Sequence, residues 1–396
     1  MRICFVTEDF YPNFIGGEGV YGYHLVSQLQ KLGHKITILA EYRPRRASFW
    51  RCKKNIQLTS VPFCFKNPLI LAVFEYLAFI LKFRKTYFDI VHANQLSGLF
   101  FVLLKPKNVG KVIVSIHHTN YDMHEVADFW FKRLLYHPLI WLERIMYARA
   151  DGLLFNSKEE EKNVSSYYDL KNRQTTSVYL GVEMPRFTSE ERQKARERIR
   201  RDLKIAKDAA IVLYVGRLVK KKKINVLLSA LSQLNESHEN IFGIIIGRGK
   251  DSGRLKTLAP PNVIFKGFVL DTKPYFLAAD LFVTTSVAEG GFLLTALEAA
   301  SFGLPLILSP SAAGFPIIKE GINGFIISPD DPKLLADKIK RVIREMKGDL
   351  PAGLRLRGRS DSRSRQVGKE SRKIARNFSW EKCAKETLSH YLHIMR

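Results

Sequence analysis

Residues 2–40 read RICFVTEDFYPNFIGGEGVYGYHLVSQLQKLGHKITILA, and this stretch decides the fold. Residues 3–6 and 35–40 are apolar runs of the length and composition typical of buried strands. Between them, residues 21–32 carry leucines on one helical face, and Gly33 follows as a helix stop. A strand, a helix and a second strand in this order predict a βαβ unit with parallel strands.

The alternation of strands and helices continues in two series. The first predicts strands at residues 3–6, 35–40, 90–93, 112–116 and 152–156. After a polar segment at 185–207, the second predicts strands at residues 210–215, 241–246, 263–265, 281–284, 306–308 and 324–326. Helices should begin near Lys223, Leu293 and Asp331, and a terminal helix should follow Ser379. We therefore expect α/β domains at residues 1–183 and 184–375, followed by a final segment at 376–396.

The charge of the chain is its most unusual bulk property. Its 396 residues carry a formal net charge of +25. Such an excess favours phosphate-bearing partners. Part of it falls in residues 341–376, where basic residues alternate with Gly and Ser, and we interpret the core of this stretch, 346–368, as a mobile basic loop. The chain has no nucleic-acid-binding motif, so we expect no nucleic acid partner.

Cysteine usage and hydropathy bear on the location of the protein. The four cysteines show no C-x-x-C spacing, which argues against a disulfide framework and a zinc site. The N-terminus lacks the layout of a signal peptide. The longest apolar run, residues 69–81, contains Glu75 and is too short to span a bilayer. These features predict a cytoplasmic protein without a transmembrane helix.

Glycines and basic residues follow the first predicted strand of each domain, at the edge where ligands bind in open α/β folds. Gly16 and Gly17 offer bare backbone N–H groups at a helix start, although a tight turn explains them equally well. Arg217 and Lys222 suit a diphosphate, because Arg forks onto two oxygens and Lys adds a compact charge. The alternative for these two residues is a solvated basic run.

Acidic and histidine side chains occur near the same strand ends. Glu289 lies in a Gly-rich loop, and Glu298 lies among apolar residues of the next helix, where it could hold a ribose diol or simply favour the helix dipole. His117 and His118 end a strand and could donate to a sugar hydroxyl. His92, inside a strand, is more typical of a buried structural residue.

No two aspartates stand two residues apart, so the D-x-D arrangement that holds a divalent metal against a diphosphate is missing. Arg217, Lys222 and helix dipoles would then have to neutralise a leaving diphosphate. We therefore predict chemistry without a metal ion.

Taken together, these features resemble glycosyltransferase family 4, whose retaining enzymes have the GT-B architecture of two Rossmann-like domains facing each other across a cleft. The resemblance covers nearly the whole chain. Its pieces are Pro12-x-x-x-Gly16-Gly17, Leu32-Gly-His34, Asp89-Ile-Val-His92, Ala150-Asp151 with Asn156-Ser157, Gly181-Val-Glu183 with Phe187, Gly216-Arg217-Leu218 with Lys222, Ala279-Asp280, Ser286-x-x-Glu289, Leu297-Glu-Ala299 with Gly303-x-Pro305, and Phe378-Ser-Trp-Glu381.

The resemblance implies a role for each candidate residue. Arg217 and Lys222 would bind the donor diphosphate, and Glu298 would hold the nucleotide ribose. Glu289 and His117 would contact the transferred sugar, and are the candidate catalytic residues. The donor-sugar loop would consist of Gly290, Gly291, Phe292 and Leu293, with Gly16 and Gly17 assisting at the diphosphate. The donor would be a nucleoside-diphosphate sugar used as co-substrate, with no other cofactor, and the last helix would return to the N-terminal domain.

The chain departs from the family pattern at two places near the donor site. Eight residues lie between Glu289 and Glu298, where the family has seven, and Lys223 stands where the family usually has Gly. The extra residue falls in the Gly-rich loop and could displace Glu289, since an error of about 1 Å can cost on the order of 100-fold in rate.

An aromatic and basic segment at residues 128–147 suggests the acceptor. It is compatible with a helix in the interface of an anionic membrane, or with an ordinary core-facing helix broken at Pro138. With the net charge, it favours a hexosyltransferase of envelope polysaccharide or glycolipid synthesis that acts on a glycan or lipid-linked acceptor at the inner face of the membrane. The alternatives are a non-catalytic GT-B-like module that binds an anionic polymer or lipid, and a sugar-nucleotide epimerase, which needs no acceptor.

Overall fold

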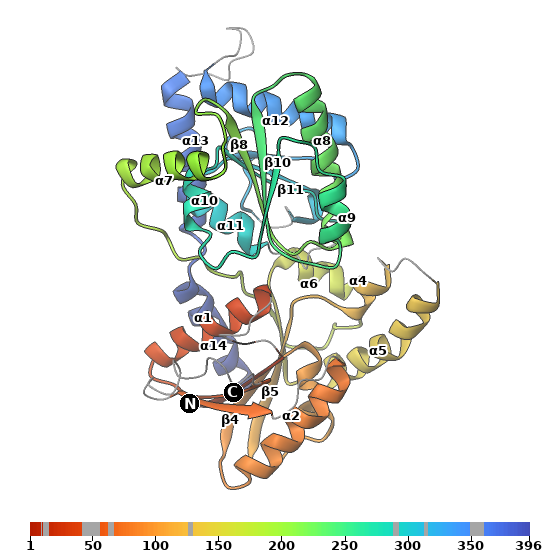
Figure 1. Cartoon of the computed structure of the whole chain (residues 1–396). Coiled ribbons are helices and arrows are strands. Elements are labelled where there is room, and N and C mark those ends of the chain that lie inside the picture. Colours follow the sequence, from red (N-terminus) through yellow and green to blue (C-terminus); the bar gives the residue numbers. More distant parts are fainter. Residues whose placement is uncertain are drawn as a thin grey trace. The chain divides into compact units, whose positions relative to one another are not determined.

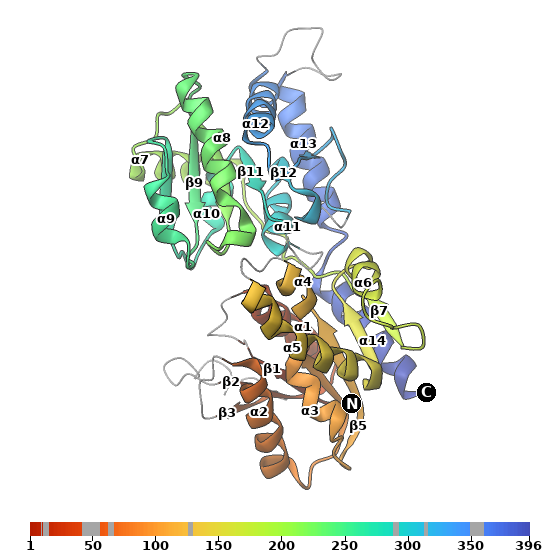
Figure 2. The same cartoon turned by 90° about the vertical axis from the view of Figure 1, so that its right-hand side faces the viewer.

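The structure of the protein is a computed structural model that describes residues 1–396 apart from 9, 11–15, 42–55, 62–66, 126–129, 288–292, 313–315 and 349–359. The chain divides into two compact units (Figure 1). The first unit comprises Met1–Gly181 with Trp380–Arg396, and the second comprises Val182–Ser379. Each unit is an open parallel sheet with helices on both faces (Figure 2).

The first unit contains a seven-stranded sheet in the described part of the chain, in the order β3-β2-β1-β4-β5-β6-β7. Its strands are β1 (Arg2–Thr7), β2 (Lys35–Glu41), β3 (Ile56–Val61), β4 (Phe88–Asn94), β5 (Val109–Ile116), β6 (Gly152–Phe155) and β7 (Thr175–Ser177). Its helices are α1 (Gly17–Lys31), α2 (Pro68–Phe83), η2 (Gln95–Gly98), α3 (Leu99–Leu103), α4 (Asn120–Glu125), α5 (Trp130–Arg149), α6 (Lys158–Ser165) and α14 (Trp380–Met395).

The two faces of the first sheet bury separate apolar layers. On one face, α2 and α3 cover buried side chains such as Cys4, Val6 and Val91. On the other face, α1 packs beside α14, and the ring of Trp380 stacks on His24 with ring centroids 4.6 Å apart. The C-terminal helix is therefore part of the first unit, although the chain reaches it only after the second unit (Figure 1).

The second unit contains a six-stranded sheet in the described residues, in the order β10-β9-β8-β11-β12-β13. Its strands are β8 (Ala210–Val215), β9 (Ile241–Ile246), β10 (Val263–Gly267), β11 (Leu281–Thr284), β12 (Leu306–Leu308) and β13 (Gly324–Ile326). Its helices are α7 (Ser189–Asp202), η3 (Lys220–Lys222), α8 (Ile224–Glu236), α9 (Ser252–Thr257), α10 (Lys273–Ala278), α11 (Leu294–Ser301), η4 (Pro310–Ala312), α12 (Pro332–Lys347) and α13 (Ser360–Ala375).

The strand order fixes where each unit can bind a ligand. In both sheets the order runs outward in two directions from one pair of central strands, β1 with β4 and β8 with β11. At such a switch point the connections leave to opposite faces, so that a crevice opens outside the carboxyl ends of the two strands. The loops after β1 and β4, and those after β8 and β11, are therefore the candidate binding loops.

The structure confirms the predicted α/β fold with two parallel sheets and adds two edge strands. The sequence did not predict β3 (IQLTSV) or the three-residue β7 (TTS), because both contain several polar residues and neither forms the continuous apolar run of a central strand. No helix in the described part of the chain is long and apolar enough to cross a membrane.

The structure corrects one sequence interpretation and shows a helix in a segment for which none was predicted. The described parts of the stretch 346–368 are not loop, because α12 extends to Lys347 and α13 begins at Ser360. The polar segment 185–207 contains the helix α7, which opens with a capping box between Thr188 and Glu191. Neither α7 nor α13 was predicted, because most of their residues are charged or polar and only a few, such as Ile199 and Val367, are both apolar and buried.

Candidate active site

Glycines let two loops approach each other at the carboxyl edge of the second sheet. A Cβ atom on Gly247 would lie 1.8 Å from the carbonyl oxygen of Gly216, and one on Gly249 would lie 2.0 Å from that of Leu218. The backbone N–H of Leu218 donates to the carbonyl of Arg248 at 2.9 Å. The loop after β8 is thereby fixed against the loop after β9, with the Arg217 side chain exposed at the strand end.

Lys222 is held beside the segment that follows β11. The Thr285 hydroxyl donates to the carbonyl oxygens of Lys222 and Lys223 at 3.0 and 2.9 Å, and the N–H of Val287 donates to the carbonyl of Lys221 at 2.9 Å. Lys222 is buried. The structure thus brings the loop predicted to bind the diphosphate to the start of the Gly-rich loop. Glu289, Gly290, Gly291 and Phe292 lie outside the described residues, whereas Leu293 is buried at the start of α11.

Lys223 has a left-handed backbone, with φ 42° and ψ 39°. This conformation explains why glycine is common at the position, since other residues pay about 1–2 kcal/mol there. We expect Lys223→Val to lower the free energy of unfolding by about 1–2 kcal/mol, because a branched Cβ adds crowding, and Lys223→Gly to be neutral or stabilising. Thermal unfolding of both variants measures this. Equal stability of the Val and Gly variants would contradict it.

Glu298 is a half-buried carboxylate on α11 that forms no hydrogen bond or ion pair with another described residue. Burial raises the pKa of Glu298 to about 7 from its ordinary value of 4.5. A half-buried carboxylate without a partner among the described residues gains from a hydrogen-bond donor that a ligand supplies. A ribose diol has two hydroxyl groups that could donate to such a carboxylate.

The raised pKa of Glu298 makes a prediction about stability and pH. The folded protein holds this proton up to about pH 7, whereas the unfolded chain loses it near pH 4.5, so the stability from protonated Glu298 is lost as the pH rises between these values. Glu298→Gln, which cannot ionise, should therefore be more stable than wild type at about pH 8 by roughly 1–3 kcal/mol, and equal to it near pH 4. Denaturant unfolding at both pH values tests this. If the variant and wild type differ in their free energy of unfolding by the same amount at both pH values, ionisation of Glu298 is not the cause.

In the first unit, His117 presents an unused hydrogen-bond donor after β5. Asn156 Nδ2 donates to His117 Nδ1 at 2.9 Å, so the ring proton is on Nε2. Nε2 is buried and has no hydrogen-bond partner among the described residues. Burial lowers the pKa of His117, the largest effect on it, which keeps the ring neutral. A neutral imidazole with a fixed N–H suits donation to a sugar hydroxyl.

His92 belongs to a buried hydrogen-bond network next to His117. Its Nε2 lies 2.6 Å from Ser115 Oγ, which is 3.1 Å from Tyr21 Oη, and its Nδ1 is hydrogen bonded to the hydroxyl of Tyr391 on α14. The Tyr21 ring meets the His117 ring edge-on at a centroid distance of 4.8 Å. His92 is fully buried and both of its nitrogens are engaged, so its role is structural.

Gly16 and Gly17 lie at the start of α1, at the carboxyl edge of the first sheet. A Cβ atom on Gly16 would meet nothing within 4 Å, so the space around it is open. Next to this helix start, Gln95 Nε2 lies 3.1 Å from Glu18 Oε1 and 2.7 Å from His118 Nδ1. The start of α1 thus lies in open space beside a polar cluster.

Sequence reasoning missed four features that the structure places at these edges. Asn156, Gln95 and Glu18 orient or accompany the candidate residues, and the loop Gly247-Arg248-Gly249 supports Arg217. The last carried a signal, a Gly-x-Gly directly after an apolar run. Asn156 carried one as well, since Asn156-Ser157 is a piece of the family resemblance, although its contact with His117 was not predicted. Gln95 and Glu18 carried none, because their partners are distant in the sequence. Among the described residues, no three His, Cys, Asp or Glu side chains are grouped to hold a metal ion.

Comparisons with known proteins agree with this architecture. Residues 15–186 match the model of Glycosyltransferase Family 4, and residues 195–359 match that of Glycosyl transferases group 1. Spore coat protein SA of Bacillus subtilis is 30% identical over 329 residues, which cover 78% of this chain and 80% of that protein.

Solved structures show the fold. HepE of Anabaena in complex with UDP-glucose has a TM-score of 0.72 at 17% identity and covers 98% of this chain and 99% of its own. WaaG, a glycosyltransferase involved in lipopolysaccharide biosynthesis, has a TM-score of 0.72 at 17% identity, with 97% and 98% covered. The fold is therefore that of the GT-B transferases. The chain belongs to glycosyltransferase family 4, as its motifs predict.

Proposed function

We propose that the protein is a retaining hexosyltransferase that uses a nucleoside-diphosphate sugar and needs no metal ion or other cofactor. The observation that carries the proposal is the fixed contact, at the switch point of the second sheet, between the loop of Arg217 and Lys222 and the segment at Thr285. A diphosphate at this edge meets two cations. The complex of HepE with UDP-glucose supports a donor of this class.

The proposed reaction requires the chain to stabilise a leaving diphosphate. As the bond between the sugar and the phosphate breaks, negative charge grows on the phosphate oxygen, and Arg217 and Lys222 neutralise it. The acceptor hydroxyl adds to the sugar on the same face and gives its proton to the leaving phosphate. Glu298 holds the ribose, and His117 donates from Nε2 to a hydroxyl of the transferred sugar. Glu289 is proposed to contact the same sugar.

Release of nucleoside diphosphate from a panel of nucleotide sugars, with a lipid and glycan extract as acceptor source, tests the proposal. Release should occur for one donor, should be unchanged by EDTA, and should disappear in Arg217→Ala. Magnetic resonance of the product should show the anomeric configuration of the donor. If no donor is turned over and none binds, the protein would instead be a non-catalytic module for an anionic polymer or lipid.

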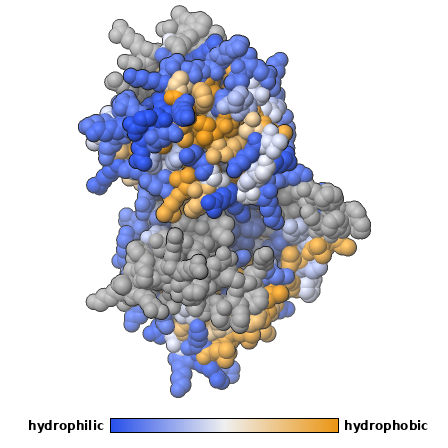
Figure 3. Space-filling model, viewed as in Figure 1, coloured by the Kyte–Doolittle hydropathy of each residue, from blue (hydrophilic) through white to orange (hydrophobic). Residues whose placement is uncertain are grey.

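We further propose that the acceptor is a glycan or a lipid-linked glycan of the cell envelope, reached at an anionic membrane surface. WaaG, which shares the fold, is involved in lipopolysaccharide biosynthesis. Helix α5 exposes Leu134, Leu135 and Trp141, by 61%, 68% and 61%, next to the exposed Arg133. Other residues of this segment, such as Ile140, face the core. Hydrophobic side chains gather over α2 and α5 (Figure 3).

Substitution on α5 measures the membrane contact. Leu134→Glu combined with Leu135→Glu should reduce co-sedimentation with anionic liposomes by about tenfold or more, because two apolar side chains are lost and two repulsive charges are added. The matched control combines Leu258→Glu with Leu270→Glu, which changes exposed leucines of the second unit in the same way. Wild-type protein that does not sediment with such liposomes at moderate salt would remove the proposal.

A further inference from the structure

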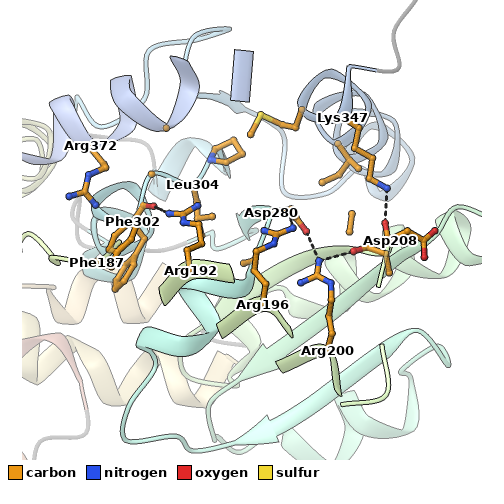
Figure 4. A pocket seen from close by; sticks show the side chains of 18 of the residues that line it. Phe187, Arg192, Arg196, Arg200, Asp208, Asp280, Phe302, Leu304, Lys347 and Arg372 are labelled. Carbon is orange, nitrogen blue, oxygen red and sulfur yellow. Dashed lines mark hydrogen bonds and ion pairs between the residues drawn. The ribbon is translucent and has the colours of Figure 1, made fainter. Parts of the chain in front are cut away.

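The second unit contains a cavity of about 840 Å³ at the edge of the sheet opposite to the candidate donor site (Figure 4). Ala210 at the start of β8, Asp280 before β11 and Pro305 before β12 line it, so it lies at the amino ends of the strands. Arg217 and Thr285 follow the carboxyl ends of β8 and β11. The cavity is therefore a separate site from the candidate donor site.

Basic residues outnumber acidic residues in the lining of this cavity. Two aspartates, Asp208 and Asp280, face a much larger set of cations. The basic lining residues are Arg192, Arg196, Arg200, Lys207, Lys347, Lys369 and Arg372. A cavity with so unequal a lining favours an anion with several charges.

Helix α7 supplies three of the arginines, Arg192, Arg196 and Arg200, which are spaced four residues apart and so share one face (Figure 4). Asp280 is the shared partner of two of them, at 2.7 Å from Arg196 and 3.4 Å from Arg200. That carboxylate also accepts from the N–H of Ile211 at 2.8 Å. The Arg200 side chain is 8% exposed, yet its Nε has no hydrogen-bond partner among the described residues.

Two further guanidinium groups are fixed without a carboxylate partner in the described part of the chain. Arg372 donates to the carbonyls of Ser301 and Pro185 at 2.8 and 3.1 Å, and Arg192 donates to the carbonyl of Phe302. Both lie about 5 Å from the ring centroid of Phe187, at 5.0 Å for Arg192 and 4.9 Å for Arg372. Burial, and after it the charges of Arg196 and Arg372, lower the pKa of Arg192. The positive charge here is thus only partly compensated.

The shape of the lining indicates which anion fits. Phe187 stacks on Phe302 with ring centroids 5.8 Å apart. The guanidinium groups of Arg192 and Arg372 lie over the Phe187 ring, which orients them. At the other end, Lys347 donates to the carbonyl of Asp208 at 2.9 Å. Guanidinium groups at one end of the cavity and ammonium groups at the other can each bind phosphate oxygens, so the cavity suits a chain of several phosphates.

We propose that this cavity binds an oligophosphate, either free or as the phosphate chain of a nucleotide. The ligand joins α7, α12 and α13, and it relieves the repulsion among their cations. Binding therefore stabilises the second unit. The site is independent of the donor site and would exist even if the protein transferred no sugar.

Calorimetric titration of sodium tripolyphosphate tests the proposal. We use Arg217→Ala as the background, to remove phosphate binding at the donor site, and about 0.1 M salt to screen weak surface binding. Tripolyphosphate is expected to bind at one saturable site. When Arg196→Gln and Lys369→Gln are added to this background, the affinity for tripolyphosphate should fall by about tenfold or more. The control pair, Arg198→Gln with Lys373→Gln, removes exposed charges from the same two helices and should change the affinity by less than about twofold.

The outcomes distinguish a nucleotide from a free oligophosphate, and they distinguish failure of the cavity proposal from failure of the proposed function. ATP that binds more tightly than tripolyphosphate identifies a nucleotide, equal affinity identifies a free oligophosphate, and both support the site. Absence of saturable tripolyphosphate binding overturns it, as does a control pair that weakens binding as much as the cavity pair. If the wild type still binds a nucleoside diphosphate through Arg217, only the cavity proposal fails.

Discussion

Arg217→Ala is expected to weaken binding of the donor's nucleoside diphosphate by about 100-fold. A charge-assisted hydrogen bond contributes about 1.5–3 kcal/mol, and 1.4 kcal/mol corresponds to tenfold in affinity. The exposed Arg217 side chain adjoins Lys222 in one loop, and the variant leaves that loop intact because the Gly216 and Leu218 backbone contacts remain. Titration of the diphosphate into wild type and variant measures the effect.

The control for Arg217 is Arg254→Ala. Arg254 is an exposed arginine of the same unit whose partner is Asp251, 3.5 Å away. This variant has the same net charge as Arg217→Ala, and it should bind the diphosphate as wild type does. Equal weakening in both variants would show that Arg217 acts only through the overall charge, and the assignment of the diphosphate site would be wrong.

His117→Ala is expected to lower kcat by about 100-fold, with a smaller effect on KM. Loss of one preorganised hydrogen-bond donor at a reacting group costs on the order of 10²–10³ in rate. The unused Nε2 donor of His117 is the group removed. Asn156→Leu keeps the ring but removes the donor that fixes its tautomer, so it should lower kcat by a smaller factor.

His393→Ala is the control for His117, because His393 is an exposed histidine of the same unit on α14. Its kcat should equal that of the wild type. A normal kcat in His117→Ala, with unchanged thermal stability, would remove His117 from the catalytic residues.

The central strands could be predicted from the sequence because strands buried on both faces need uninterrupted apolar runs. That is why β1, β8 and β11 were found with nearly their observed limits, and why Gly16, His117 and Arg217 could be placed at carboxyl edges. The resemblance to family 4 then supplied roles that periodicity does not contain. The comparisons confirm the family and the fold.

Features that depend on tertiary contacts could not be predicted. The pairing of Asn156 with His117 joins residues 39 apart, and the left-handed backbone of Lys223 shows no sign in its own side chain. The arginines of α7 lie in the polar segment 185–207, for which no helix was predicted, although their spacing of four residues indicates one helix face. Only the folded second unit shows that this face lines a cavity.

The most direct test of the proposed function is a thermal-shift panel of UDP, GDP, ADP and CMP, with and without Mg²⁺. A ligand at 100 times its dissociation constant adds about 2.7 kcal/mol of stability, which should raise the melting temperature by several degrees. We predict that one nucleoside diphosphate raises it equally with and without Mg²⁺, and that Arg217→Ala removes most of the increase. No shift with any of these nucleotides would contradict the account and favour a non-catalytic binding module.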